Sequence, residues 1–95
     1  MYLFVEVIFY SDKRKYLPEK GYHPDAVFNE NSDYWGITFV ELQIEKFDAP
    51  APAVIIFTFQ EYHYQEVKEG QSFKIMEGPH QVGEGKIISI EAGSY

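Results

Sequence analysis

The sequence contains no cysteine, and this absence removes several classes of chemistry at once. Disulfide bonds, thiolate catalysis and zinc sites built on cysteine are all excluded. A chain without disulfides fits a reducing compartment, and we expect a cytoplasmic protein. Helical periodicity is missing too, because no segment sustains the apolar spacing of an amphipathic helix.

Basic residues are scarce, with 8 Lys and Arg against 15 Asp and Glu and a formal net charge of −7. An acidic surface repels phosphate backbones, so general binding to nucleic acid is disfavoured. Lys13, Arg14 and Lys15 form the single basic cluster, within a charged stretch (Ser11–Gly21) that we interpret as a long solvated loop. The charge imbalance favours solubility and suits a basic partner.

Long hydrophobic runs are also absent. The apolar opening YLFVEVIFY is interrupted by Glu6 and is too short to cross a membrane. It lacks the basic start and the small-residue cleavage site of a signal peptide. We therefore expect no membrane association and interpret Tyr2–Tyr10 as the first strand of the mature protein.

The sequence is rich in aromatic residues, at 18%, with 8 Phe and 8 Tyr, and such residues favour strands. Alternating polarity predicts a series of strands: Tyr2–Tyr10, Tyr22–Phe28, Tyr34–Phe47, Ala53–Tyr64, Ser72–Glu77 and Gln81–Ile90. The first strand has one clean core face: Leu3, Val5, Val7 and Phe9. The predicted strand Ala53–Tyr64 has another: Ile55, Phe57 and Phe59. In Tyr34–Phe47 the apolar residues change face midway, which predicts a β-bulge.

Turn-forming residues separate these strands. Asn29–Asp33 has turn chemistry, Asp48–Pro52 is predicted to be a stiff connector, and Gln65–Gly70 is predicted to be a turn. Several short strands at this spacing predict an all-β barrel or sandwich, and closing the sheet would remove exposed edges. We predict one domain over residues 1–95.

The Gly70–Ile90 stretch reads as a strand, a tight glycine turn and a second strand. Its pattern resembles the end of the third domain of the elongation factor Tu family, which carries a Val-Gly-x-Gly strand, and the positions in register are Phe73, Ile75, Glu77, Gly78, Val82, Gly83, Gly85 and Ile87. Gly21-Tyr22-His23-Pro24 resembles the family's Gly-Tyr-Arg-Pro, and the Trp35-Gly36 region and the run Val54–Tyr64 follow in the family's order. The resemblance implies a single six-stranded antiparallel closed β-barrel.

The chain also departs from that family. It has no GTPase domain and no phosphate-binding loop, so nucleotide hydrolysis is excluded and no nucleotide is expected. Where the family places basic residues toward tRNA, this chain has His23, Met76 and His80. These replacements put tRNA binding of the family's kind in doubt, because losing phosphate contacts removes much of such affinity. Protein contact, the family's other use of this barrel, does not need those arginines.

Gly83 and Gly85 are two residues apart in a predicted strand and so share a face that carries no side chains. Glycine in a strand allows a close approach of other groups. The approaching group is either another strand of the barrel or a partner molecule.

The spacing of the histidine, acidic and serine residues does not match that of a catalytic or metal-binding motif. His23, His63 and His80 show no ligand-like spacing, and the pairs Glu41/Glu45 and Glu61/Glu66 are ordinary in an acidic chain. His63 and Glu66 would face opposite ways on a strand. No serine lies in a nucleophile motif. We predict that the protein is not an enzyme, with no catalytic residues, no metal and no cofactor.

Aromatic residues provide the better candidate surface, since tyrosine and tryptophan are enriched at binding hot spots. Tyr62 and Tyr64 would flank His63 on the predicted strand, with Tyr34 and Trp35 as further members. The candidate partner surface is Tyr22, His23, Tyr62, His63, Tyr64, Met76, Glu77, Gly78 and His80.

The first hypothesis is a non-enzymatic protein-binding module. It would copy or compete for a translation-factor surface, or act as a small immunity-type inhibitor of a basic toxin. The alternatives are a translation-associated factor that binds RNA or the ribosome, and an enzyme or ligand binder with a pocket at the barrel mouth. The oligomeric state is left open.

Overall fold

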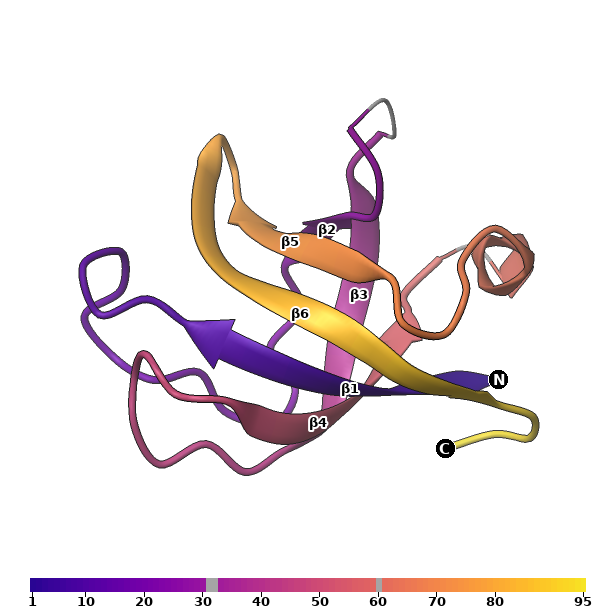
Figure 1. Ribbon diagram of the computed structural model, residues 1–95, viewed down its shortest axis with the longest axis horizontal. Coiled ribbons are helices and arrows are strands. Elements are labelled where there is room, and N and C mark those ends of the chain that lie inside the picture. The colour runs from indigo at the N-terminus through magenta and orange to yellow at the C-terminus, as the bar shows by residue number, and fades with distance from the viewer. Residues whose placement is uncertain (31–32, 60) are drawn as a thin grey trace.

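The computed structural model describes residues 1–30, 33–59 and 61–95, and over these residues the chain forms one closed antiparallel barrel of six strands (Figure 1). The predicted fold class is thereby confirmed. In chain order the elements are β1 (Tyr2–Phe9), β2 (Asp25–Val27), β3 (Trp35–Leu42), β4 (Ala51–Phe57), the 3-10 helix η1 (Glu61–Gln65), β5 (Ser72–Glu77) and β6 (His80–Glu91). Around the barrel the strands follow the order β1-β4-β3-β2-β5-β6, and β6 closes onto β1.

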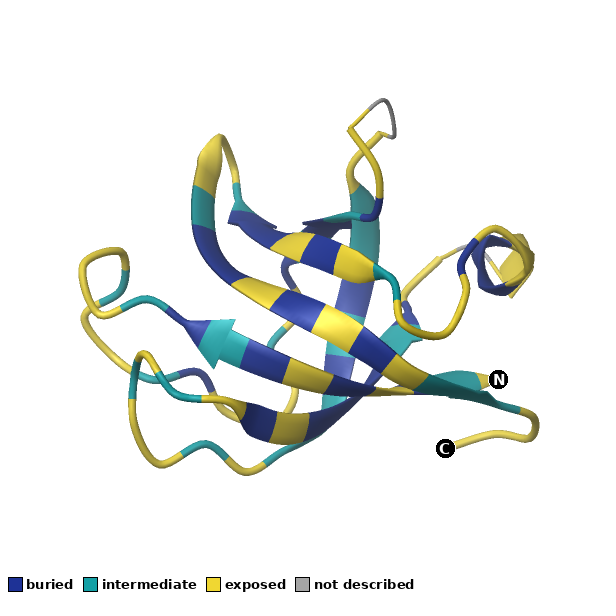
Figure 2. Cartoon of the chain, viewed as in Figure 1, coloured by how far each residue is buried: buried dark blue, intermediate teal, exposed yellow. Residues whose placement is uncertain are grey.

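Buried and exposed residues alternate along the strands, as Figure 2 shows for those in view, and the buried ones form the core. The predicted inward residues of β1 are all buried, and the fully buried side chains come from every long strand: Leu3, Val7, Phe9, Ile37, Phe39, Ile55, Ile75, Val82 and Ile87. Burying aromatic and branched side chains on one face of each strand supplies the main stabilisation of the barrel. The charged residues of β1 and β6 lie on the opposite faces of these strands or near their ends.

The bulge predicted in the Tyr34–Phe47 segment is confirmed. In the β3–β4 ladder Phe39 lies opposite Ile55 and Glu41 lies opposite Val54, so Val40 is the extra residue. The bulge moves the apolar pattern from one face to the other, which matches the change seen in the sequence. The strand itself is shorter than predicted, because β3 ends at Leu42.

The predicted strand Ala53–Tyr64 is wrong at both ends. β4 begins earlier, at Ala51, so Pro52 belongs to the strand rather than to a connector. It ends earlier too, at Phe57, although the Thr58 N–H still donates a hydrogen bond to the carbonyl oxygen of Gly36 in β3. Gln60 of this prediction lies outside the described residues, as do residues 31 and 32 of the predicted turn Asn29–Asp33.

The close approach at the glycines of β6 comes from within the chain. A Cβ atom on Gly85 would lie 2.2 Å from Cζ of Phe73, the residue opposite it on β5. A Cβ on Gly83 would lie 2.5 Å from the carbonyl oxygen of Ile8 on β1. Both glycines therefore serve barrel packing, and the groups that approach them belong to the two adjacent strands rather than to a partner.

Candidate functional site

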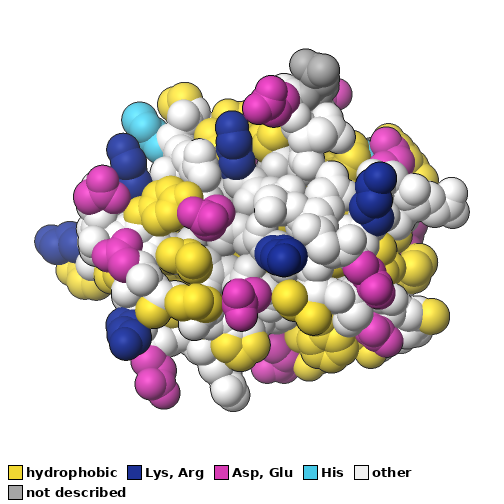
Figure 3. Space-filling view, viewed as in Figure 1, with side chains coloured by type: hydrophobic (Ala, Val, Ile, Leu, Met, Phe, Trp, Pro, Cys, Tyr) yellow, Lys and Arg dark blue, Asp and Glu magenta, His cyan; other side chains and the backbone are white. Residues whose placement is uncertain are grey.

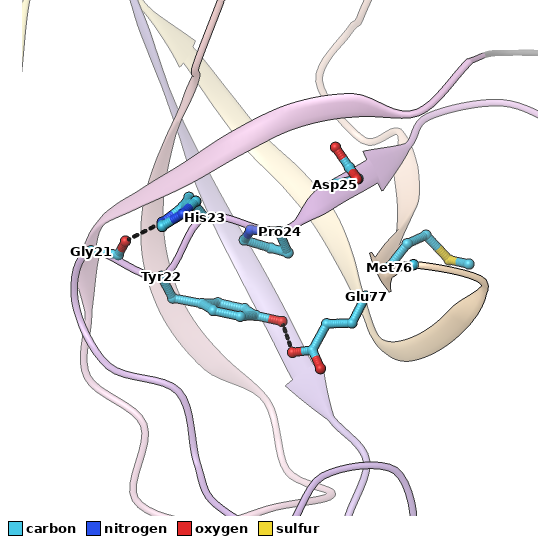
Figure 4. Close-up of a pocket in the computed structure, with 8 residues that line it drawn as sticks. Gly21, Tyr22, His23, Pro24, Asp25, Met76 and Glu77 are labelled. Carbon is cyan, nitrogen blue, oxygen red and sulfur yellow. Dashed lines mark hydrogen bonds between the residues drawn. The ribbon is translucent and has the colours of Figure 1, made fainter.

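The candidate partner residues lie in two separate places. Five of them gather beside the β5–β6 turn and line a shallow depression of about 400 Å³ together with Gly21, Pro24 and Asp25: Tyr22, His23, Met76, Glu77 and Gly78 (Figure 4). His80 begins β6 and is exposed. Tyr62, His63 and Tyr64 belong to η1, a different element.

Two residues that line the depression beside the β5–β6 turn, Tyr22 and Glu77, are bonded within the chain. The Tyr22 hydroxyl donates to Oε2 of Glu77 at 2.5 Å, and Arg14 pairs with the same carboxylate. The guanidinium carbon of Arg14 also lies 4.8 Å from the centre of the Tyr22 ring. Burial, followed by the hydrogen bond to Glu77, raises the pKa of Tyr22. These contacts tie the β1–β2 loop to the hairpin.

Two sequence-based interpretations change at this place. Arg14 is not a solvated loop residue, since its side chain is only 19% exposed and paired with Glu77. Met76 is buried, at 8% exposure, and contributes little to any surface. Because Tyr22 and Glu77 bond to each other and to Arg14 within the chain, their role in the depression is structural.

The second place is built by η1, where the strand interpretation is corrected. Tyr64 turns inward, is 3% exposed, and its hydroxyl accepts a hydrogen bond from the Phe57 backbone N–H at 3.0 Å. Tyr62 points outward and is 57% exposed. The two tyrosines therefore do not share a face, and Tyr64 is removed from the candidate surface.

His63 is buried against Trp35. The two rings stack at 3.7 Å between centroids with an interplanar angle of 11°, and Trp35 also has ring contacts with Phe28 and Phe57. Nδ1 of His63 lies 3.3 Å from Oε1 of Glu66, an arrangement that the helical turn permits and a strand would not. His63 thus forms a fixed floor rather than an exposed contact.

Three exposed aromatic side chains lie around this floor. Tyr34 is 48% exposed, Phe59 80% and Tyr62 57%. Together with Asp33, Trp35, Gly36 and His63 they line a shallow hollow of about 330 Å³, which we call the aromatic groove. Large apolar groups gathered at the surface mark contact sites more often than single ones do.

Phe59 was missed as a surface residue, because the strand pattern predicted it to be inward-facing with Ile55 and Phe57. Its ring instead lies over Gly36, where an added Cβ would be 3.1 Å from the ring carbon Cε2. The missing side chain at position 36 therefore makes room for the ring. No local sequence signal reveals this contact, because it depends on β4 ending at Phe57.

Charge is unevenly distributed around the molecule. Asp33 lines the aromatic groove, while Glu61 and Glu66 lie on and just after η1. The sequence has no Lys or Arg in residues 21–45 or 47–67, the stretches that supply every lining residue of the groove. The basic loop with Lys13, Arg14 and Lys15 lies at the opposite end of the barrel from η1 (Figure 1).

On the face shown in Figure 3, hydrophobic side chains reach the surface among acidic and basic ones.

The described residues include no group of three or more His, Asp and Glu that could hold a metal ion. Within the same residues, no helix is long and apolar enough to cross a membrane.

Comparisons of the chain with known protein families, characterised proteins and solved structures found no match. The resemblance to the third domain of elongation factor Tu therefore stays a prediction made from the residues of the Gly70–Ile90 stretch.

Proposed function

We propose that this chain is a non-enzymatic protein-binding module that contacts its partner through the aromatic groove. The observation that carries the proposal is the exposure of Tyr34, Phe59 and Tyr62 around one hollow whose floor is the stacked pair Trp35 and His63. Aromatic residues are enriched among the few residues that supply most of the binding energy at protein interfaces, because each removes a large apolar area from water.

The proposal includes the two more specific roles that the sequence suggests. One is a module that copies or competes for a surface of a translation factor, and the other is an immunity-type inhibitor of a basic toxin. Both would use a small acidic barrel as a rigid support for a contact surface. RNA binding is the less favoured role, because a net charge of −7 repels a phosphate backbone.

The proposal is tested by capture of partners from a lysate of the native host on three immobilised proteins: the wild type, the double variant Phe59→Ala/Tyr62→Ala, and Tyr16→Ala. Tyr16 is a matched control, since it is an aromatic residue with 70% exposure in the β1–β2 loop. We expect one captured protein to bind the wild type and Tyr16→Ala equally well. Its affinity for the double variant should be lower by about tenfold or more.

Two outcomes would contradict the proposal. Equal retention of that protein by all three baits would show that the aromatic groove is not the contact surface. Capture of RNA that is lost after nuclease treatment and at high salt would support the alternative RNA-binding role instead.

A further inference from the structure

We propose that the aromatic groove receives a lysine or arginine side chain from a basic segment of the partner protein. This inference rests on the proposed function and adds the chemistry of the partner. It combines two features of the groove, its exposed rings and its surrounding carboxylates.

The rings offer the first feature. The exposed side chains of Tyr34, Phe59 and Tyr62 surround a hollow of about 330 Å³, which suits one long side chain rather than a folded domain. A cation near an aromatic face is attracted by the negative potential of the ring. The Trp35 and His63 rings of the floor are held in place by their stack, so these two rings lose little freedom on binding.

The charges offer the second feature. Asp33 lines the groove, and Glu61 lies next to Tyr62 on η1. None of the described residues that line the groove is a lysine or an arginine. A purely apolar occupant would cover Asp33 without pairing it, which is unfavourable. A side chain with an apolar stem and a charged end satisfies both the rings and the carboxylates.

The inference is tested by comparing the binding of an arginine probe with that of its neutral isostere. The two probes are N-acetyl-arginine amide and N-acetyl-citrulline amide, which match in shape and differ in charge. Trp35 is the sole tryptophan and lies in the groove, so its indole signal in NMR spectra reports occupancy directly. Both titrations are run at the same total ionic strength, so that general screening does not distinguish them.

We expect the arginine probe to shift the Trp35 indole signal and the citrulline probe to shift it much less at equal concentration. Tyr62→Ala and Asp33→Asn should each weaken the arginine response about two- to fivefold, as loss of one exposed cation–π or charge contact implies. Tyr16→Ala should leave it unchanged. An indole signal at its wild-type position without probe confirms that each variant is folded.

Equal responses to both probes, or no response to either, would overturn the inference. Neither result would by itself remove the proposed function, because the capture experiment decides that separately. A groove that retains its partner in a manner dependent on Phe59 and Tyr62, yet ignores the arginine probe, would be a contact site for apolar groups alone.

Discussion

Gly85 shows how one residue sets the packing of this barrel. The Phe73 ring lies across the strand pair at the position where any other residue would place a side chain. Phe73 also stacks on Phe28, with 4.8 Å between the ring centroids, so it has little room to move aside. An aromatic residue that covers a glycine on the neighbouring strand restores the apolar contact that the glycine lacks.

We predict that Gly85→Ala lowers the free energy of unfolding by about 1–3 kcal/mol, the usual cost of overpacking a well-filled core. The double variant Phe73→Leu/Gly85→Ala should lose less than the sum of the single variants, since the clash is then relieved. Urea denaturation of the four proteins measures both quantities. Simple additivity would show that the Phe73 ring is not what excludes a side chain at position 85.

At the scale of elements, η1 determines which aromatic residues reach the surface. It follows directly after β4, and its inward residue Tyr64 satisfies the N–H of Phe57 at the end of that strand. Its outward residue Tyr62 remains available in the aromatic groove. The short helix therefore both completes the end of β4 and presents part of the proposed contact surface.

We predict that Tyr64→Phe lowers the free energy of unfolding by about 1–3 kcal/mol, because the buried N–H of Phe57 would lose its acceptor. Tyr62→Phe removes the same atom from an exposed position and should change stability by less than about 0.5 kcal/mol. Denaturation of this matched pair measures the difference. Equal stability of the two variants would argue against the Phe57–Tyr64 hydrogen bond as the contact that holds η1.

The whole molecule contains tyrosines that resist ionisation. Burial, and then a hydrogen bond to Glu84, raises the pKa of Tyr10 to about 12, and burial also raises the pKa values of Tyr22 and Tyr64. Tyrosine in an unfolded chain loses its proton near a pH of about 10. The folded state therefore keeps protons that the unfolded state has already released.

We predict that stability is unaffected by these groups below pH ~10 and falls as the pH rises from about 10 to about 12. The free energy of unfolding of Tyr10→Phe should fall less steeply with pH across this window, because phenylalanine has no proton to lose. Unfolding free energies measured at a series of alkaline pH values compare the two proteins. Identical slopes would contradict the raised pKa of Tyr10.

The outcome at individual residues shows how far local patterns reach. Alternation identified Leu3, Val5, Val7 and Phe9 as core, and all four are buried. The bulge near Val40 was also predictable, because a change of face leaves a direct trace in the order of apolar residues. The β5–β6 hairpin has a similarly local cause in the glycine turn at Gly78.

The residues of the aromatic groove could not be predicted from a local pattern of this kind. Phe59 was placed in the core and Tyr64 on the surface, and the structure reverses both assignments. Both assignments depend on the end of β4 at Phe57 and the start of η1 at Glu61. A long aromatic run favours a strand, but the run alone does not reveal where that strand ends.

The sequence by itself determined the all-β class, the inward face of the first strand, the bulge and the final hairpin, because these follow from the spacing of neighbouring residues. Tertiary structure alone decided that Arg14 locks the β1–β2 loop to Glu77 and that Tyr34, Phe59 and Tyr62 meet around one hollow. Those contacts join residues far apart in the chain. Their formation depends on barrel closure, which brings strand ends together in an order that no local pattern encodes.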